Sequence, residues 1–255
     1  SNPVGISGCG KNVFLLTKNN IVAFNDKGKQ VYTAHHGYSN PVMVTSAKRV
    51  LTYDQGGYQF RVDSNKSAMG NKKLTEKIVY GAVSNKGYAA IVTQSERYTI
   101  HLTVFDSGLK EVLSWNVSDQ IITSVDFNSS STACAVSAFS VSGGAVSSKV
   151  YELELKESKP ERFSISFPDV MALSIRYQSG GNLMVVGDEK LYCLDSSGKL
   201  KAEWDYTGKL LAYDNSSAEG TTIFYENTDG NGNIALRRFD KNGQLGSSAE
   251  TEGEI

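Results

Sequence analysis

Phe24-Asn25-Asp26-Lys27-Gly28-Lys29 is one of four similar segments that decide the fold. In each segment an apolar residue ends a strand-like run, and an Asp or Asn followed by Gly is typical of the tight turn that comes next. The other three segments are Phe105-Asp106-Ser107-Gly108, Leu194-Asp195-Ser196-Ser197-Gly198-Lys199 and Phe239-Asp240-Lys241-Asn242-Gly243-Gln244. A weaker copy is Val62-Asp63-Ser64-Asn65-Lys66, and Leu153-Glu154-Leu155-Lys156 fills the remaining gap.

The spacing of these copies predicts a repeat architecture. Positions 25, 63, 106, 154, 195 and 240 are separated by 38, 43, 48, 41 and 45 residues. A period of about 43 residues with four strands per unit is typical of a β-propeller blade. The sequence therefore predicts an all-β fold, a single β-propeller domain over residues 1–255 with six four-stranded antiparallel blades, or seven or eight if the native chain is longer. The expected blades span residues 4–34, 41–76, 77–118, 119–166, 169–206 and 209–252.

The strand patterns inside each unit support this prediction. Second strands such as Ala89 to Val92 and Leu183 to Val186 are apolar at consecutive positions, as expected where neighbouring blades cover both faces of a sheet. The third strand, from Tyr98 to Val104, alternates between apolar and polar residues. The fourth strand is polar and often aromatic, as in Lys201 to Trp204. No segment of more than about ten residues has apolar residues at helical spacing.

Composition excludes several classes of protein. With 40% hydrophobic residues the chain can bury a sizeable core, so disorder is not expected. The 26 basic and 27 acidic residues nearly cancel, so no bulk field attracts nucleic acid or an anionic membrane. The apolar runs are far shorter than a membrane span, and the residues given predict no signal peptide. Membrane association is expected only through a native N-terminal anchor absent from this chain. Cys9, Cys134 and Cys193 lie far apart, and we expect buried thiols rather than a disulfide framework.

Two further stretches resemble a known family. They are Arg49 to Val62 after Asn40-Pro41-Val42, and Gly87 to Thr93 followed by Leu102 to Asp106 and Trp115. Over most of the chain these residues resemble an uncharacterised family of propeller proteins from Gram-positive anaerobic bacteria, known only as a domain of unknown function. The resemblance implies an N-terminal membrane anchor and a location outside the cytoplasm, and it implies no activity.

A weaker similarity is to quinoprotein-like and WD40-like propellers. Gly198-Lys199 with Trp204, and Gly108 with Trp115, match the Gly turn followed by Trp of quinoprotein blades. The sequence lacks their regular Trp placement and vicinal cysteine pair, so we interpret both Trp residues as blade packing.

Metal and cofactor motifs are weak in this sequence. His35 and His36 are adjacent, so on a strand they point to opposite faces and no nearby motif adds further ligands. Asp229, Asn231 and Asn233 place oxygen ligands at alternate positions, as in a calcium loop, but Ile234 stands where such a loop has Gly. A long hairpin turn is the favoured interpretation, calcium is the alternative, and no cofactor is predicted.

Propeller geometry indicates where a site would lie. Loops that join second and third strands share one face with the connectors between blades, and ligands of propellers commonly use that face. On it we expect residues 54–58, 94–97, 140–145, 187–189 and 227–233, together with His35, His36 and Tyr38. Aromatic and Arg side chains make good anchors. The candidate ligand contacts are Tyr38, Asp54, Tyr58, Arg97 and Asp188.

Two classes of function fit these observations. The first is a non-enzymatic extracytoplasmic propeller that binds a protein or a cell-surface glycan, and the absence of a catalytic motif favours it. The second is a carbohydrate-active enzyme, a lyase or glycosidase, that uses carboxylates at the channel mouth such as Asp54 and Asp188. Two buried, closely spaced carboxylates would favour the second class.

Overall fold

The computed structural model describes residues 3–94, 100–228 and 233–252, and the chain divides into two compact units. The first unit comprises Ser1–Asp119, Ser129–Thr132 and Leu155–Ser158. The second comprises Gln120–Asn128, Ala133–Glu154 and Lys159–Ile255. Each unit contains its own hydrophobic clusters.

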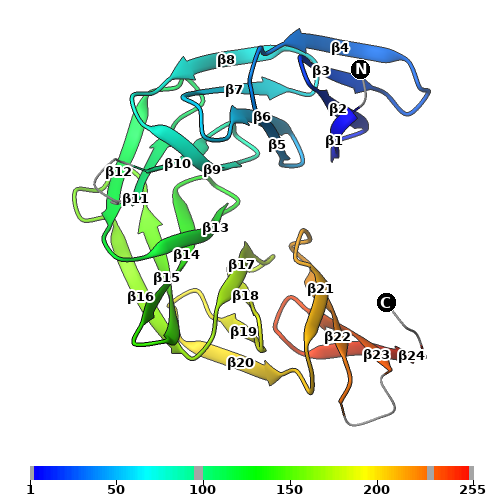
Figure 1. The fold of residues 1–255 in the computed structure, drawn as a ribbon, viewed down its shortest axis with the longest axis vertical. Coiled ribbons are helices and arrows are strands. Elements are labelled where there is room, and N and C mark those ends of the chain that lie inside the picture. Colours follow the sequence, from blue (N-terminus) through cyan, green and yellow to red (C-terminus); the bar gives the residue numbers. More distant parts are fainter. Residues whose placement is uncertain (1–2, 95–99, 229–232, 253–255) are drawn as a thin grey trace. The chain divides into compact units, whose positions relative to one another are not determined.

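The first unit holds three antiparallel four-stranded sheets whose strands pair in chain order (Figure 1). The first sheet contains β1 (Pro3–Cys9), β2 (Asn12–Thr17), β3 (Asn20–Phe24) and β4 (Gln30–His35). The second contains β5 (Pro41–Thr45), β6 (Arg49–Asp54), β7 (Gln59–Ser64) and β8 (Ala68–Lys73). The third contains β9 (Lys77–Val83), β10 (Ala89–Gln94), β11 (Ile100–Phe105) and β12 (Glu111–Val117).

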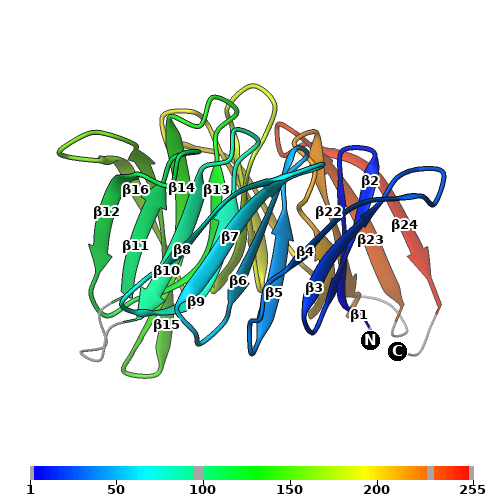
Figure 2. The same ribbon diagram turned by 90° about the horizontal axis from the view of Figure 1, so that it is seen from above.

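The second unit holds three further antiparallel four-stranded sheets whose strands also pair in chain order (Figure 2). Its first sheet contains β13 (Ile121–Phe127), β14 (Ala133–Ser142), β15 (Ala145–Glu154) and β16 (Glu161–Pro168). The next contains β17 (Ala172–Tyr177), β18 (Leu183–Gly187), β19 (Lys190–Leu194) and β20 (Leu200–Asp205). The last contains β21 (Leu210–Asp214), β22 (Gly220–Glu226), β23 (Ile234–Asp240) and β24 (Leu245–Thr251).

These six sheets confirm the predicted fold class. The described residues form 24 strands and no helix, and six four-stranded antiparallel sheets match the blades of a six-bladed β-propeller. Within the described ranges, no helix is long and apolar enough to cross a bilayer. The three cysteines are buried and unpaired, as predicted.

The repeated turns have one chemistry. Oδ1 of Asn25 accepts hydrogen bonds from the backbone N–H groups of Lys27 and Lys29, at 3.0 and 2.9 Å. The side chains of Asp106, Asp195 and Asp240 accept the equivalent pair of bonds in their own turns. A side-chain acceptor that closes the chain on itself is the mechanism by which Asp and Asn favour turns. The repeat found in the sequence is therefore the link between the third and fourth strands of a blade.

In the second sheet the turn residue is Ser64, and the prediction that Asp63 forms the turn is wrong. Oγ of Ser64 accepts bonds from the N–H groups of Lys66 and Ser67. Asp63 is the penultimate residue of β7 and is fully buried, and its carboxylate binds Arg61. The prediction from the Asp spacing is therefore wrong by one position. In this blade the side chain that accepts the backbone hydrogen bonds of the turn is a Ser rather than an Asp.

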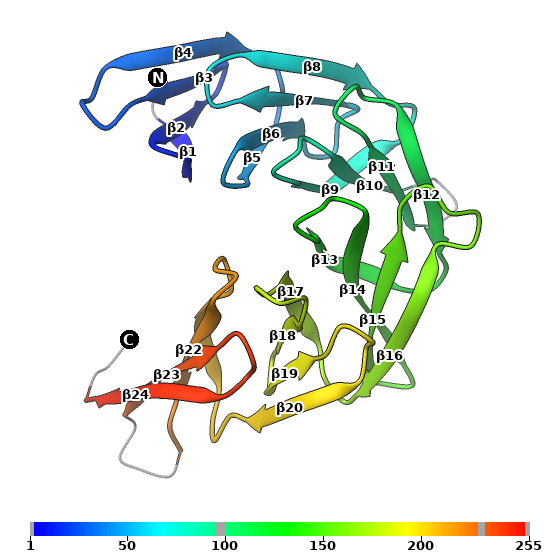
Figure 3. The ribbon, with the colours of Figure 1, turned by 180° about the vertical axis from the view of Figure 1, so that it is seen from behind.

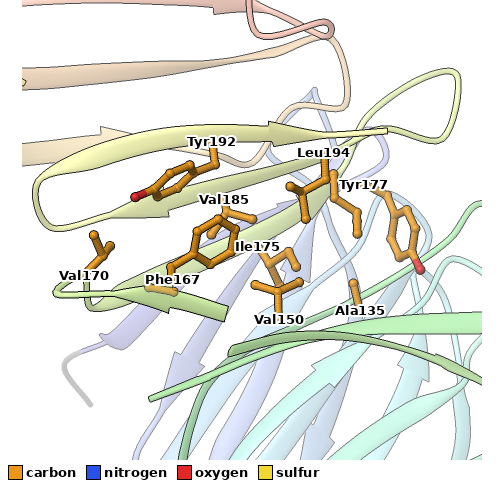
Figure 4. Close-up of a cluster of buried hydrophobic side chains, with 11 residues drawn as sticks. Ala135, Val150, Phe167, Val170, Ile175, Tyr177, Val185, Tyr192 and Leu194 are labelled. Carbon is orange, nitrogen blue, oxygen red and sulfur yellow. The ribbon is translucent and has the colours of Figure 1, made fainter. Parts of the chain in front are cut away.

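The cores lie between neighbouring sheets. In the first unit Leu51, Phe60 and Ile91 belong to a cluster built from the second and third sheets. In the second unit Val150 and Phe167 pack in one cluster with Ile175 and Tyr192 (Figure 4). This cluster joins the sheet that begins with β13 to the sheet that begins with β17. All five residues of β18 are buried, whereas all seven of β24 are exposed. The consecutive apolar residues of the second strands therefore reflect sheets covered on both faces, as predicted.

Candidate functional site

A cavity of about 660 Å³ opens in the second unit beside the sheet that begins with β17. Its lining residues come from β17, the loop between β18 and β19, the end of β20, and the connector that leads to β21. Figure 3 labels the strands β17 to β20 in the ribbon. The lining residues are Leu173, Asp188, Glu189, Lys190, Asp205, Tyr206, Thr207, Gly208, Lys209 and Leu210. The cavity therefore combines a loop between second and third strands with a connector between blades, which is the combination that the sequence predicted for a site.

Asp188 is held in place by the backbone at the start of the first strand. Its Oδ1 accepts a bond from the N–H of Met171 at 2.8 Å, and its own N–H donates to the carbonyl of Met171 at 3.0 Å. Asp188 follows Gly187, where a Cβ would come within 2.5 Å of a Val170 methyl. One carboxylate oxygen is thus committed to the fold, while the side chain remains on the cavity wall.

The connector is fixed on both sides by backbone bonds. The N–H of Tyr206 donates to the carbonyl of Glu189 at 3.0 Å. The carbonyl of Lys209 accepts from the N–H of Glu226 at 2.8 Å, and Oγ1 of Thr207 donates to Asn227 Oδ1 at 3.1 Å. Both ends of the connector are therefore tied to neighbouring strands.

Tyr206 is the unusual residue of this wall. It is only 9% exposed, its ring stacks on Tyr225 with 6.0 Å between centroids, and its hydroxyl is buried without a hydrogen-bond partner in the described structure. Burial raises the pKa of the Tyr206 hydroxyl well above its usual range, and the nearby Asp188 carboxylate raises it further. Tyr206 therefore stays neutral, and its hydroxyl is a buried polar group without a partner in the described structure.

The charged residues of the cavity are unequally paired. The ammonium of Lys190 lies 2.7 Å from Glu203 Oε1 and 2.8 Å from Asp205 Oδ1. These two carboxylates hold the pKa of Lys190 above its usual range. In the described part of the chain, Asp188 and Glu189 have no cationic partner within 4.0 Å.

Three of the predicted contact residues, Tyr38, Asp54 and Tyr58, belong to the first unit. Tyr38 is 7% exposed, lies 5.1 Å from the ring of His36, and burial raises its pKa to about 12. Asp54 Oδ1 accepts a bond from the N–H of Asn40 at 2.8 Å. Tyr58 is 39% exposed, and its carbonyl accepts from Leu74 N–H. Of the two tyrosines, only Tyr58 has a side chain that is exposed to a partner.

Asp54 and Asp188 occupy the same place in two blades. Each lies at the end of a second strand, and each carboxylate accepts the backbone N–H that precedes the first strand, from Asn40 and Met171 respectively. The sequence argument selected both residues as ligand contacts, and the structure gives both a role in closing their sheets. Of the two, only Asp188 lines the cavity that Tyr206 also lines.

The remaining predicted residues are divided by the described ranges. Arg97, Asp229 and Asn231 lie outside them, whereas Asn233 lies inside and its carbonyl accepts a bond from Asn227 N–H. The segment joins β22 to β23, which pair antiparallel from Glu226 opposite Ile234. Residues 229–232 lie outside the described ranges, so the choice between a hairpin turn and a calcium loop stays a prediction. Across the described ranges, no group of three or more His, Cys, Asp or Glu side chains is placed to hold a metal ion.

One buried carboxylate, Glu152, and one half-buried carboxylate, Asp126, bear on the enzyme alternative. Asp126 and Glu152 flank Ala135 in neighbouring strands, on the same face of the sheet that begins with β13. Glu152 accepts bonds from Tyr177 and Arg162, at 2.8 and 2.9 Å. Asp126 pairs with Arg176 at 3.0 Å and accepts Tyr177 N–H at 2.8 Å. Both carboxylates are thus saturated by neighbours and lie outside the cavity lining, which is the arrangement of a structural network.

Tyr206, Lys190 and Asp205 were missed by the sequence argument. Their contacts form only in the folded chain. Tyr206, for example, is unusual because its ring stacks on Tyr225 and its hydroxyl is buried without a partner in the described structure. One signal was present: Tyr206 follows the fourth strand at the start of a connector, the place from which His36 and Tyr38 were selected in the first blade.

A family model described as "Family of unknown function (DUF5711)" matches residues 2–255. No curated protein matches the chain in sequence. Solved structures similar to this chain include apo AztD from Citrobacter koseri, with a TM-score of 0.63 and 13% identity over 98% of this chain and 72% of that one. The Pan2 WD40 domain of Neurospora crassa matches with a TM-score of 0.57 and 12% identity over 87% of this chain and 71% of that one.

A eukaryotic initiation factor matches with a TM-score of 0.62 and 10% identity over 97% of this chain, which spans 65% of that structure. At such low identity these likenesses support the fold alone.

Proposed function

The chain belongs to the DUF5711 family of unknown function, and from that premise we propose that it is a non-enzymatic binding module that engages a protein or a cell-surface glycan outside the cytoplasm. The observation that carries this proposal is the cavity that is lined by Asp188, Glu189 and Tyr206. Ligand sites are concave, largely preformed, and contain a few converging polar groups.

The chemistry of the cavity supports binding over catalysis. One carboxylate oxygen of Asp188 accepts a hydrogen bond from Met171 N–H, and Asp205 forms an ion pair with Lys190. Tyr206 stays neutral because burial raises the pKa of its hydroxyl. A general base needs a group poised to take up a proton near neutral pH. The groups on this wall are better suited to accept hydrogen bonds from a ligand that is then released unchanged.

The proposed location outside the cytoplasm is supported by the resemblance of residues 40–62 and 87–106 to propellers that carry a membrane anchor. A balanced charge of −1 also fits a ligand recognised by local contacts rather than by a field over the whole surface.

The proposal is tested on printed arrays of bacterial surface glycans and of peptides, with the purified chain as the probe. Glu189→Trp would fill the mouth of the cavity from an exposed position. Ser247→Trp is the matched control, because it puts the same ring on exposed β24. We expect ligands whose signal is lost with Glu189→Trp and kept with Ser247→Trp. Signals equal for both variants would reject this cavity as the site, and no signal for the wild-type chain would reject the proposed protein or glycan partner.

A further inference from the structure

We propose that Ser114 on β12 is an activated nucleophile that accepts an acyl group from an activated carboxylic ester. The first unit places Glu76, His101 and Ser114 side by side, in the order carboxylate, imidazole and hydroxyl. This inference goes beyond the binding function proposed above, because it concerns the other unit and a covalent step rather than reversible recognition.

Three polar contacts cross the sheet that begins with β9. Oγ of Ser114 lies 2.9 Å from Nε2 of His101 on β11. Nδ1 of the same ring lies 3.4 Å from Oε2 of Glu76, the residue that directly precedes β9. Thr93 on β10 is buried, and its hydroxyl donates to the same carboxylate oxygen at 2.6 Å. The four side chains therefore form one continuous row of polar contacts across the sheet.

The strand register explains why these side chains meet. Thr93 lies directly opposite His101, and Thr103 lies opposite Ser114. Side chains two positions apart share one face of a strand, so His101 and Ser114 are diagonal neighbours on the same face. A side chain as long as that of His spans this diagonal. The arrangement is therefore held by the sheet itself rather than by a loop.

The same contacts assign the proton of the imidazole. A carboxylate accepts hydrogen bonds and donates none, so Nδ1, the ring nitrogen beside Glu76, carries the hydrogen. Nε2 then presents its lone pair to Ser114, whose hydroxyl donates to it. This is the tautomer in which an imidazole removes a proton from a serine. The distance of 3.4 Å to Glu76 fits the looser contacts that such groups make before a substrate is bound.

Ser114 is open to a reagent. It is an exposed residue, and the side chains of His101 and Glu76 are 29% and 32% exposed. In the described sheet β12 is the outermost strand, so one edge of its backbone has no strand partner. Backbone N–H groups at such an edge can stabilise the oxygen of a carbonyl under attack. An ester can therefore reach the hydroxyl directly from solvent.

The proposed step is a single acyl transfer. Oγ of Ser114 attacks the ester carbonyl while its proton moves to Nε2 of His101. A new bond joins Oγ to the acyl carbon, and the bond from that carbon to the leaving oxygen breaks. The proton then passes from Nε2 to the leaving oxygen, which departs as an alcohol or a phenol. The step needs no oxidant or reductant, and it leaves Ser114 as an ester.

The test treats the full chain with p-nitrophenyl acetate and locates the acetyl group by peptide mass spectrometry. Hydroxylamine cleaves esters and leaves acetylated lysines intact, so the two products are told apart. We expect an ester at Ser114 that is absent from Ser114→Ala and forms at least about a hundredfold more slowly in His101→Gln. Ser247→Ala is the matched control and should leave this ester unchanged. Ser247 is also exposed on the outermost strand of its sheet, and in the described structure it has no imidazole partner.

Glu76 is a positioning residue, and its test is the tautomer of His101. Long-range ¹H–¹⁵N spectra should show the hydrogen on Nδ1 in the parent chain, and the His101 signals are identified by their absence from His101→Gln. In Glu76→Gln the new amide can donate to Nδ1, so we expect the hydrogen to move to Nε2 and acetylation to slow. A residue that only supports the fold would leave the tautomer unchanged.

The outcomes are decisive in both directions. Esters spread equally over Ser114 and Ser247, or an ester at Ser114 that forms as fast in His101→Gln, would overturn the proposal. A hydrogen on Nε2 in the parent chain would also overturn it. If His101→Gln fails to fold, the preference of the parent chain for Ser114 over Ser247 and the Glu76→Gln spectra still decide. Continuous release of p-nitrophenolate that requires Ser114 would support the nucleophile and contradict only the non-enzymatic part of the proposed function.

Discussion

Arg61→Met is expected to destabilise the first unit strongly, because it would leave Asp63 buried and without a counter-ion. Asp63 is fully buried, and the Arg61 guanidinium binds both of its oxygens, with Nε at 2.8 Å and Nη2 at 2.7 Å. Tyr32 on β4 donates its hydroxyl to the same carboxylate at 2.8 Å. Arg61 also binds the carbonyl of His35 at 2.9 Å, so this network joins the fourth strand of one sheet to the third strand of the next.

The expected magnitude follows from this burial. Removing one member of a buried ion pair costs about 3–5 kcal/mol, because the remaining charge loses its partner without regaining water. For a chain of this length that loss corresponds to roughly 6–20 °C in Tm. The Tyr32 hydroxyl alone cannot replace a bidentate guanidinium, since a single hydrogen bond to a charged group contributes about 1.5–3 kcal/mol.

Removing the whole network should cost far less. In Arg61→Met with Asp63→Leu and Tyr32→Phe, no buried charge or unsatisfied hydroxyl remains, and the added side chains are apolar. Apolar replacement of a buried ion pair is often neutral or stabilising. We therefore expect the triple variant to lie within about 1–2 kcal/mol of the parent chain, a strongly non-additive result for residues in one network.

The assay can be restricted to the first unit. The chain has two tryptophans, Trp115 in the first unit and Trp204 in the second. In a Trp204→Phe parent, urea unfolding followed by tryptophan fluorescence reports on the surroundings of Trp115 alone. A loss below about 1 kcal/mol for Arg61→Met would show that the pair is effectively solvated. A triple variant as unstable as the single one would show that the network is required for more than its own neutralisation.

Further predictions concern the turns, the cavity and the thiols. Asp195→Asn should keep the fold, since Asn25 makes the same bonds in the first blade, whereas Asp195→Ala should raise amide exchange in residues 196–199. The Ser197 hydroxyl and neighbouring N–H groups lower the Asp195 pKa, so its stabilisation exists above the unfolded pKa of about 3.9 and is lost as pH falls below it; urea titrations across acid pH should show a smaller loss for Asp195→Asn. Gly198→Ala should destabilise the second unit by at least about 1–2 kcal/mol in urea, because φ is +82° and a Cβ would lie 2.4 Å from the Phe163 ring. Tyr206→Phe should leave the unliganded chain as stable as the parent or more so, by up to about 1–3 kcal/mol in Tm-derived free energy, and a clear loss would mean that its hydroxyl has a partner. Burial raises the pKa of Cys193 to about 11 and also raises those of Cys9 and Cys134, so none of the thiols should react with a disulfide reagent at pH 8 until the chain unfolds.

The fold could be predicted because its information is local. Four turns carry an Asp or Asn whose side chain closes them, and the apolar runs before them are strands that neighbouring sheets cover. Both features are visible in the order of residues alone. The one misplaced turn, at Asp63, shows the limit of this reasoning. A Ser can cap a turn as an Asp does, and the adjacent Asp is then free to form a buried pair with Arg61.

The site could be predicted only in part, because its chemistry depends on contacts between segments distant in the sequence. The shared face of loops and connectors follows from the strand order, and it led to Asp188. The pairing of Lys190 with Asp205 and Glu203, and the stacking of Tyr206 on Tyr225, arise only when β19, β20 and β22 are brought together. No local pattern reports that a hydroxyl is buried without a partner.

The comparison of Asp54 with Asp188 shows how a repeat fold can create one distinct site. Both carboxylates close the end of a first and second strand pair, so this bond belongs to the blade and explains the acid at that position. Function must then come from what differs around it. Beside Asp188 the connector supplies Tyr206, whose hydroxyl lacks a partner, and the loop supplies a second unpaired carboxylate at Glu189. In the binding site proposed above, two such neighbours join an acid that the fold already requires, and substitutions of these neighbours should separate binding from stability.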